Sequence, residues 1–222
     1  MRDTRKDEAY FSGYIAYQRK RIQRGDEELQ QCGATEKDKR NRVLISLVHY
    51  KADLMLAQFS AGADDVEMAG CIQSVGETLA ERDSCDYETF LQFFSMAVLY
   101  EQTDVVKTVL AKHKQYIQSD KLLQLFAGYL TEGKTVWQGG FIIDGIYDEL
   151  DALFAGGNDT AEVLLRYLEG WYENHEDAAW YECADSFADI YVGYWCLECA
   201  ALAKILNVDE GKLKENAFYP VK

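Results

Sequence analysis

Acidic side chains at helical spacing are the most prominent groups that could do chemistry in this sequence of 222 residues. Between Asp144 and Asp189 there are thirteen acidic residues and a single basic one, Arg166. Carboxylates can bind cations, act as general acids and bases, or attract a basic partner. The candidate binding face consists of ten of these residues: Asp144, Asp148, Glu149, Asp151, Glu162, Glu169, Glu173, Glu176, Asp177 and Asp185.

Metal binding is not expected from the histidines and cysteines. A di-metal centre in a helical bundle needs Glu-x-x-His motifs, and none of the three histidines (His49, His113, His175) follows a glutamate at that spacing. Cys196 and Cys199 form a CxxC, but a zinc site needs further ligands and no second CxxC exists. We therefore expect reduced thiols in a helical core, with neither a metal nor another cofactor.

Motifs of common catalytic sites are also absent from the sequence. It contains no GxGxxG, no P-loop and no GxSxG. An enzyme would instead need a pocket in which carboxyl groups with perturbed pKa values converge. The interpretation favoured by the residues is a protein without catalytic activity.

Charge is distributed unevenly along the chain. Residues 1–50 carry eleven basic and eight acidic residues, whereas residues 51–222 carry twelve and thirty. Nucleic acid is not expected as a ligand, because phosphate binding needs a basic surface. A basic protein is favoured as the partner. The alternative is that the acids form only a solvated outer face.

The hydrophobic period is helical throughout and predicts an all-α fold, a compact bundle of about eight to ten helices with no sheet. The expected helices cover residues 10–22, 35–61, 64–79, 86–99, 104–110, 122–130, 143–154, 158–171 and 186–206. Asp64 or Asp65, Asp86, Asp104 and Asn158 are the expected N-caps. Because the helix that Asp86 opens is apolar on most sides, it should be central and buried.

The acids should occupy outward faces of two of these helices. Asp144, Asp148 and Asp151 are spaced i, i+4 and i+7, opposite the apolar side chains of 143–154. On the next helix one stripe holds Asp159, Glu162, Glu169, Glu173 and Glu176. Trp180 and Tyr181, beside this acidic stretch, are candidates for exposed interface anchors.

Domain organisation and location follow from composition. A glycine-containing stretch at 131–141 and an earlier break at 113–120 divide the chain; we place the boundary between regions 1–115 and 116–222, packed as one compact unit. The first residues have no apolar core of a signal peptide, and no segment is apolar enough to span a membrane. A cytoplasmic protein without membrane contact is expected.

Glu198 differs from the other acids because apolar residues surround it in the sequence. A buried carboxylate needs hydrogen-bond donors or a charged partner. We expect a structural role for it, as a core carboxylate that ties helices together through Arg, Tyr or Trp donors.

The segment that contains Glu198 resembles a known family. Residues 191–206, YVGYWCLECAALAKIL, are similar to the signature Y-x-G-Y-W-S-x-E-A-A-A-x-A-K-I-L of PoNi-type immunity proteins, which protect against PoNe DNase toxins. Cys196 and Cys199 replace the usual Ser and Ala, small residues for small ones. Asp209, Lys212 to Lys214 and Tyr219-Pro220 match the tail that follows the signature, and Tyr167-Leu168 with Trp171-Tyr172 resembles the helix that precedes it. The N-terminal half matches more loosely, at Arg2-Asp3, Tyr10-Phe11, Tyr14-Ile15 and Phe59 to Gly62.

The resemblance implies an all-helical antitoxin without catalysis, whose partner is a cognate PoNe-like nuclease. Stoichiometric binding through the acidic helical surface would neutralise the toxin. The competing hypothesis is a helical adaptor or scaffold that binds a different basic protein. Whether the protein forms a homodimer is left open.

Overall fold

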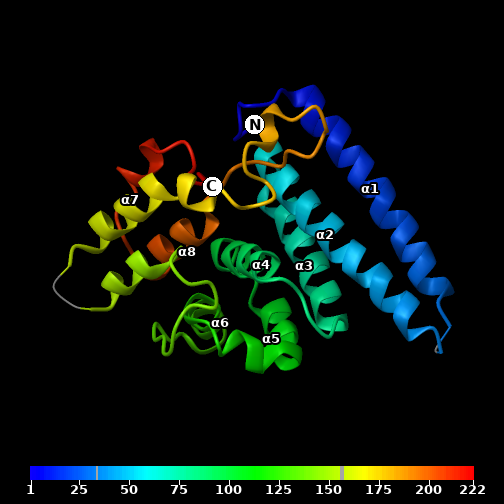
Figure 1. The fold of residues 1–222 in the computed structure, drawn as a ribbon, viewed down its shortest axis with the longest axis horizontal. Coiled ribbons are helices and arrows are strands. Elements are labelled where there is room, and N and C mark those ends of the chain that lie inside the picture. The colour runs from blue at the N-terminus through cyan, green and yellow to red at the C-terminus, as the bar shows by residue number, and fades with distance from the viewer. Residues whose placement is uncertain (34, 156–157) are drawn as a thin grey trace.

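The computed structural model describes residues 1–33, 35–155 and 158–222, and within these ranges the chain is helical with no β-strand (Figure 1). The α-helices are α1 (Glu8–Gln31), α2 (Lys37–Ala61), α3 (Asp65–Glu81), α4 (Tyr87–Leu99), α5 (Thr103–Ile117), α6 (Lys121–Glu132), α7 (Thr160–Gly170) and α8 (Leu197–Ile205). Short 3-10 helices cover Asp148–Leu153, Glu173–His175, Cys183–Asp185 and Leu213–Glu215. The all-α prediction is confirmed.

Capping residues fix most helix ends where the sequence indicated them. The side chain of Asp64 accepts hydrogen bonds from the backbone N–H groups of Val66 and Glu67 at the start of α3, and Asp86 accepts one from Thr89 at the start of α4. Two predicted caps are wrong. α5 begins at Thr103, which places Asp104 in its first turn. The cap of α7 is Asp159 rather than Asn158.

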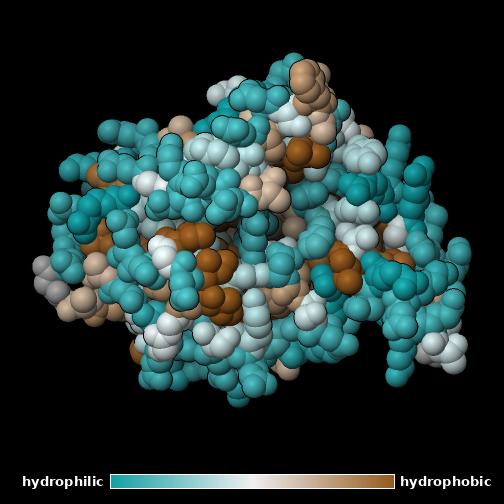
Figure 2. Space-filling model, viewed as in Figure 1, coloured by the Kyte–Doolittle hydropathy of each residue, from teal (hydrophilic) through white to brown (hydrophobic). Residues whose placement is uncertain are grey.

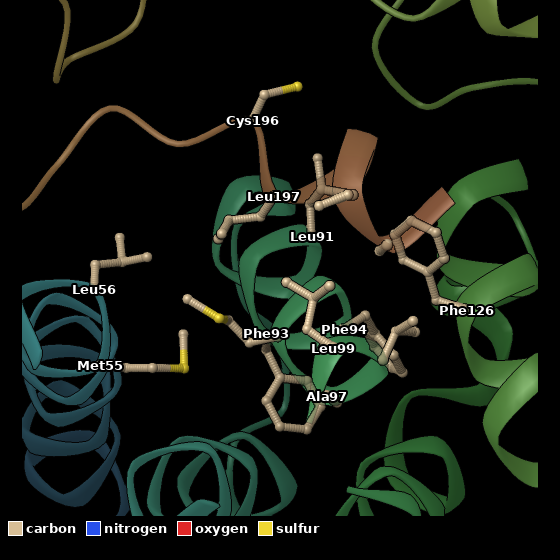
Figure 3. Packing of buried hydrophobic residues seen from close by; sticks show 14 of the residues in the cluster. Met55, Leu56, Leu91, Phe93, Phe94, Ala97, Leu99, Phe126, Cys196 and Leu197 are labelled. Atoms are coloured by element: carbon tan, nitrogen blue, oxygen red, sulfur yellow. The ribbon is translucent and has the colours of Figure 1, made fainter. Parts of the chain in front are cut away.

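α4 lies at the centre of the molecule, as its apolar sequence predicted. Eleven of its thirteen residues are buried. α8, α6, α3, α2 and α5 all contact it. Side chains of α2, α6 and the start of α8 surround those of α4, among them Met55, Phe126 and Leu197 (Figure 3). This one core joins the two halves of the sequence.

The predicted helix over residues 143–154 does not form. The chain makes turns up to Tyr147 and then the 3-10 helix Asp148–Leu153. Gly145 has φ 88°, in the left-handed region that an α-helix cannot contain. Asp120 also holds the entry of this segment, because its side chain accepts a hydrogen bond from the backbone N–H of Ile142 at 2.9 Å.

The first half of the predicted helix over 186–206 is wrong as well, since α8 begins only at Leu197. Residues 186–196 run instead along α1 and α2 and are bound there by side chains. Tyr10 Oη accepts a hydrogen bond from the N–H of Tyr191 and donates one to its carbonyl. The Ser60 hydroxyl donates to the Val192 carbonyl at 2.6 Å. These contacts replace the hydrogen bonds that a helix would have made.

The N-terminal segment before α1 is bound to the end of α2 and to the C-terminal region. The Arg2 guanidinium donates hydrogen bonds to the carbonyls of Phe59, Ala63 and Val221. Asp3 is 1% exposed and accepts a hydrogen bond from the Tyr191 hydroxyl. Residues 1–5 therefore connect α2 to the C-terminal region.

The predicted boundary at 115/116 falls within α5, two residues beyond the kink at His113. Among the described residues, no helix combines the length and apolar character that crossing a membrane requires.

Candidate functional site: an acidic cleft

A cleft of about 900 Å³ lies between the two halves of the chain. Side chains of α1, α2 and the first turns of α4 form one wall. The other wall consists of the turns at 143–147, the segment 171–183, the segment 189–196 and the first turn of α8. Most of this second wall is built from turns rather than from regular helices, and side-chain contacts hold its segment 186–196 against α2 (Figure 1).

Carboxylates dominate the ionisable lining of this cleft. Among the described residues of the lining, Arg21 is the one arginine or lysine, and its guanidinium stacks over the ring of Tyr50 at 3.5 Å. Two histidines, His49 and His175, are also present. The carboxylates are Asp53, Asp86, Glu88, Asp144, Asp177, Asp189 and Glu198. The cleft therefore has a strongly negative potential.

Asp86 and His49 form a polar pair on the α4 side of the cleft. His49 Nε2 lies 3.0 Å from Asp86 Oδ2, and this hydrogen bond raises the pKa of His49. Partial desolvation acts against the charged form of Asp86, but hydrogen bonds from His49 and from the backbone and hydroxyl of Thr89 lower its pKa. Asp86 is therefore ionised and acts as the N-cap of α4.

Glu88 is a cleft carboxyl whose pKa is raised. Although its side chain is exposed, the surrounding walls remove much of its hydration, and this desolvation together with the charge of Asp86 raises the pKa of Glu88 to about 7. Its hydrogen bond from Gln92 spans 3.1 Å. When Glu88 is ionised, its negative charge is therefore unfavourable in the cleft.

Glu198 lies deep in the cleft wall and is 5% exposed. Its Oε1 accepts hydrogen bonds of 2.7 Å from both the Tyr167 hydroxyl and the Trp171 indole N–H. The Cys196 thiol lies 3.4 Å from the same oxygen. One carboxylate oxygen thus joins α7, the following turn and α8.

The ten residues predicted as a binding face are all exposed, but they do not form one surface stripe. Asp144 and Asp177 line the cleft. Asp148 and Asp151 lie one turn apart on a 3-10 helix, and Asp151 pairs with Lys121. Glu149 belongs to the same 3-10 helix, Glu162 and Glu169 are on α7, and Glu173, Glu176, Asp177 and Asp185 follow in turns and 3-10 helices.

The prediction of two acidic stripes at helical spacing is therefore wrong for both stripes. The first fails because residues 143–154 are not α-helical, and the second ends with α7 at Gly170. On the face shown in Figure 2, hydrophobic residues appear as separate patches within a mainly hydrophilic surface.

Four cleft carboxylates were missed by the sequence analysis as binding residues: Asp53, Asp86, Glu88 and Asp189. Asp53 and Glu88 lie outside the acidic stretch 144–189, and only the packing of α2 and α4 brings them opposite Asp144. The signal for Asp86 was its capping position. Trp180, a candidate anchor, is half-buried in the cleft and stacks on Trp171 at a ring distance of 5.1 Å, whereas Tyr181 stacks on Tyr172.

One trio in the described residues brings metal-type ligand atoms together. Atoms of His49, Cys85 and Asp86 lie within 4.8 Å of one another. Desolvation and the neighbouring Asp86 raise the pKa of Cys85 to about 12, whereas metal binding needs a thiolate. The Arg82 guanidinium also lies 3.5 Å from the Cys85 sulfur. These surroundings do not suit a cation. Cys196 and Cys199 are buried thiols in the core.

Both halves of the chain match known families of immunity proteins. Residues 2–112 match the family described as PoNe immunity protein (PoNi), N-terminal, and residues 118–222 match PoNe immunity proteins (PoNi), C-terminal. The chain belongs to the PoNi family of immunity proteins, as the resemblance of residues 191–206 indicated.

A solved structure supports the fold. The crystal structure of protein PA2201 from Pseudomonas aeruginosa is similar with a TM-score of 0.75 and 15% identity, over 98% of this chain and 87% of that one. A search of the curated proteins gives no match.

Proposed function

We propose that this immunity protein neutralises a cognate PoNe-like nuclease by stoichiometric binding through its acidic surface, without catalysis. The observation that carries the proposal is the exposure of all ten predicted acids on the C-terminal half, next to a cleft with seven carboxylates. A nuclease must present basic groups to the phosphates of DNA. The acids would take the place of those phosphates, or would bind nearby and block the entry of DNA.

Electrostatic attraction of this kind has a measurable signature. Opposite charges increase the rate of association, and salt weakens the attraction between exposed groups. We therefore expect a fast association rate that falls steeply with added salt, and a dissociation rate that changes less. We also propose that the protein acts in the cytoplasm, where it would intercept the toxin before it reaches DNA.

The test begins with co-expression of this protein and the product of the gene immediately upstream, where a toxin gene is expected. Rescue of growth and a co-purifying complex are expected. Reversing the charge of Asp144, Asp148, Glu169 and Glu173 should then weaken the complex by roughly tenfold or more while the fold survives. The matched control reverses four exposed acids elsewhere: Glu27, Glu28, Glu77 and Glu215.

Toxicity without rescue or complex formation would refute the immunity role toward that toxin. The alternative hypothesis, a helical adaptor for another basic protein, would then be favoured. If the toxin is bound with unchanged affinity after charge reversal, the acids form only a solvated face and the binding surface lies elsewhere.

A further inference from the structure

The two oxygens of the Glu198 carboxylate have different surroundings. Oε1 receives all the hydrogen bonds described above, from Tyr167, Trp171 and Cys196. Among the described residues, no donor reaches Oε2. This oxygen is not sealed inside the protein either, because the fully buried side-chain atoms without a partner are Arg82 Nε, Ser95 Oγ, Tyr100 Oη and Tyr219 Oη. Since Glu198 lines the cleft, its unpartnered oxygen is reached from there.

Glu198 is only 5% exposed, and a buried carboxylate oxygen without a partner favours the binding of a cation. The described residues that line the cleft do not supply one. The guanidinium of Arg21 is stacked on Tyr50, and the His175 ring is hydrogen-bonded to the Trp171 carbonyl at 2.6 Å. Glu88 and Asp144 add further negative charge to the same cleft.

The shape and the remaining lining of the cleft decide which cation fits. Its volume of about 900 Å³ is in the range of small-ligand pockets, so a side chain or short loop can enter but a folded domain cannot. Aromatic residues, including Trp180, Trp195 and Tyr147, contribute to the walls. A guanidinium stacks on aromatic rings, donates several hydrogen bonds in one plane and is more weakly hydrated than an ammonium group.

We propose that this cleft receives an arginine side chain of the protein partner, with Glu198 Oε2 as the deep acceptor and Glu88 and Asp144 as flanking charges. The proposal rests on the proposed function and specifies the chemistry of its contact. The arginine would enter between the two halves of the chain, so one side chain would contact both family regions at once.

The four tryptophans provide a direct test without the toxin. Trp171, Trp180 and Trp195 line the cleft, whereas Trp137 packs outside it against Phe154. Indole N–H signals of the full-length protein would be followed by ¹⁵N NMR during titration with the peptide Ac-Gly-Arg-Gly-NH₂, up to roughly 10 mM because a single contact gives millimolar affinity. The control peptide carries citrulline, which has the shape of arginine without its charge.

We expect the arginine peptide to shift the cleft indole signals and leave that of Trp137 unchanged, and the citrulline peptide to shift none. Equal shifts with both peptides, or no arginine-dependent shift, would overturn the proposal.

Glu198→Gln separates binding from structure. Its amide oxygen can still accept the hydrogen bonds of Tyr167 and Trp171, which forces the amide NH₂ into the position of Oε2 and replaces the acceptor by a donor. The peptide affinity should fall about tenfold or more, with thermal unfolding little changed. Glu28→Gln, on the exposed face of α1 and outside the cleft, is the matched control and should bind the peptide like the wild type.

Should Glu198→Gln fail to fold, Glu88→Gln tests the same cleft with a weaker expected loss of about threefold. Wild-type affinity in the folded Glu198→Gln variant, or in Glu88→Gln if it is used, would refute the arginine site. If the protein protects against the toxin but does not bind the peptide, the arginine site is refuted and the proposed function stands. If it binds the peptide but forms no complex with the toxin, the proposed function is refuted instead.

Discussion

Replacing Glu198 with alanine should destabilise the protein strongly, because two buried donors share its Oε1. Tyr167 is 1% exposed and Trp171 is 5% exposed, and each lies 2.7 Å from this oxygen. A buried donor left without an acceptor costs about 1–3 kcal/mol. Two such donors give roughly 2–6 kcal/mol, and for a chain of this size each kcal/mol lowers Tm by about 2–4 °C.

Urea and thermal unfolding of Glu198→Ala measure this effect. We expect a loss of about 4 kcal/mol and a fall in Tm of roughly 8–16 °C. Glu198→Gln should retain most of the stability, because its amide oxygen remains an acceptor, and Glu162→Ala on exposed α7 should change it by under about 0.5 kcal/mol. If Glu198→Ala unfolds within about 1 °C of the wild type, the two hydrogen bonds do not hold the helices together and the reasoning is refuted.

Three further predictions concern the cleft and its wall. The His49–Asp86 hydrogen bond raises the pKa of His49 above 6.5 and lowers the pKa of Asp86 below 3.8. The pair therefore stabilises the fold fully between pH 3.8 and pH 6.5, and this stabilisation is lost as pH rises through the raised pKa of His49. In urea unfolding, His49→Gln should therefore be less stable than the wild type at about pH 5 and nearly equal to it at about pH 9; a difference that does not depend on pH would contradict this. The pKa of Glu88 is raised from 4.5 to about 7, so its ionisation destabilises the fold as pH rises through this window. Glu88→Gln should raise Tm at about pH 8 and leave it unchanged at about pH 4, whereas equal effects at both would exclude a charge penalty. Gly193 has φ 120°, and an added Cβ would lie 2.3 Å from Ser60 Oγ, so Gly193→Ala should cost about 2–4 kcal/mol of unfolding free energy while Gly13→Ala, in open space on α1, should be neutral or stabilising; similar Tm values for the two variants would show that the wall adapts.

Sequence patterns predicted the fold well where local signals and tertiary packing agree. Asp64 and Asp86 begin helices because their side chains reach free N–H groups in the first turn, and Gly62 ends α2 because φ 91° suits a residue without Cβ. The central position of α4 was visible in its apolar composition. These features depend on residues that lie next to each other in the sequence.

The cleft could not be predicted in the same way, because contacts over long sequence distances create it. The apolar residues after Ser186 have a helical period, yet hydrogen bonds from Tyr10 and Ser60 hold this segment extended. The turn at Gly145 similarly places Asp144 on the cleft while Asp148 lies outside it. The sequence alone predicted that the ten acids of the candidate binding face are exposed, but only the packing shows which acids line the cleft together.

The anchoring of residues 1–5 has a consequence for how the protein is made. Residues 1–5 leave the ribosome long before their partners: Arg2 requires the Val221 carbonyl, and Asp3 requires the Tyr191 hydroxyl. Helices α1 to α3 can form early, but the N-terminal segment has to wait until residues 191–221 emerge. The second wall of the cleft is completed by the same late residues. A nascent chain would therefore lack a finished cleft until residues 189–198 have been synthesised.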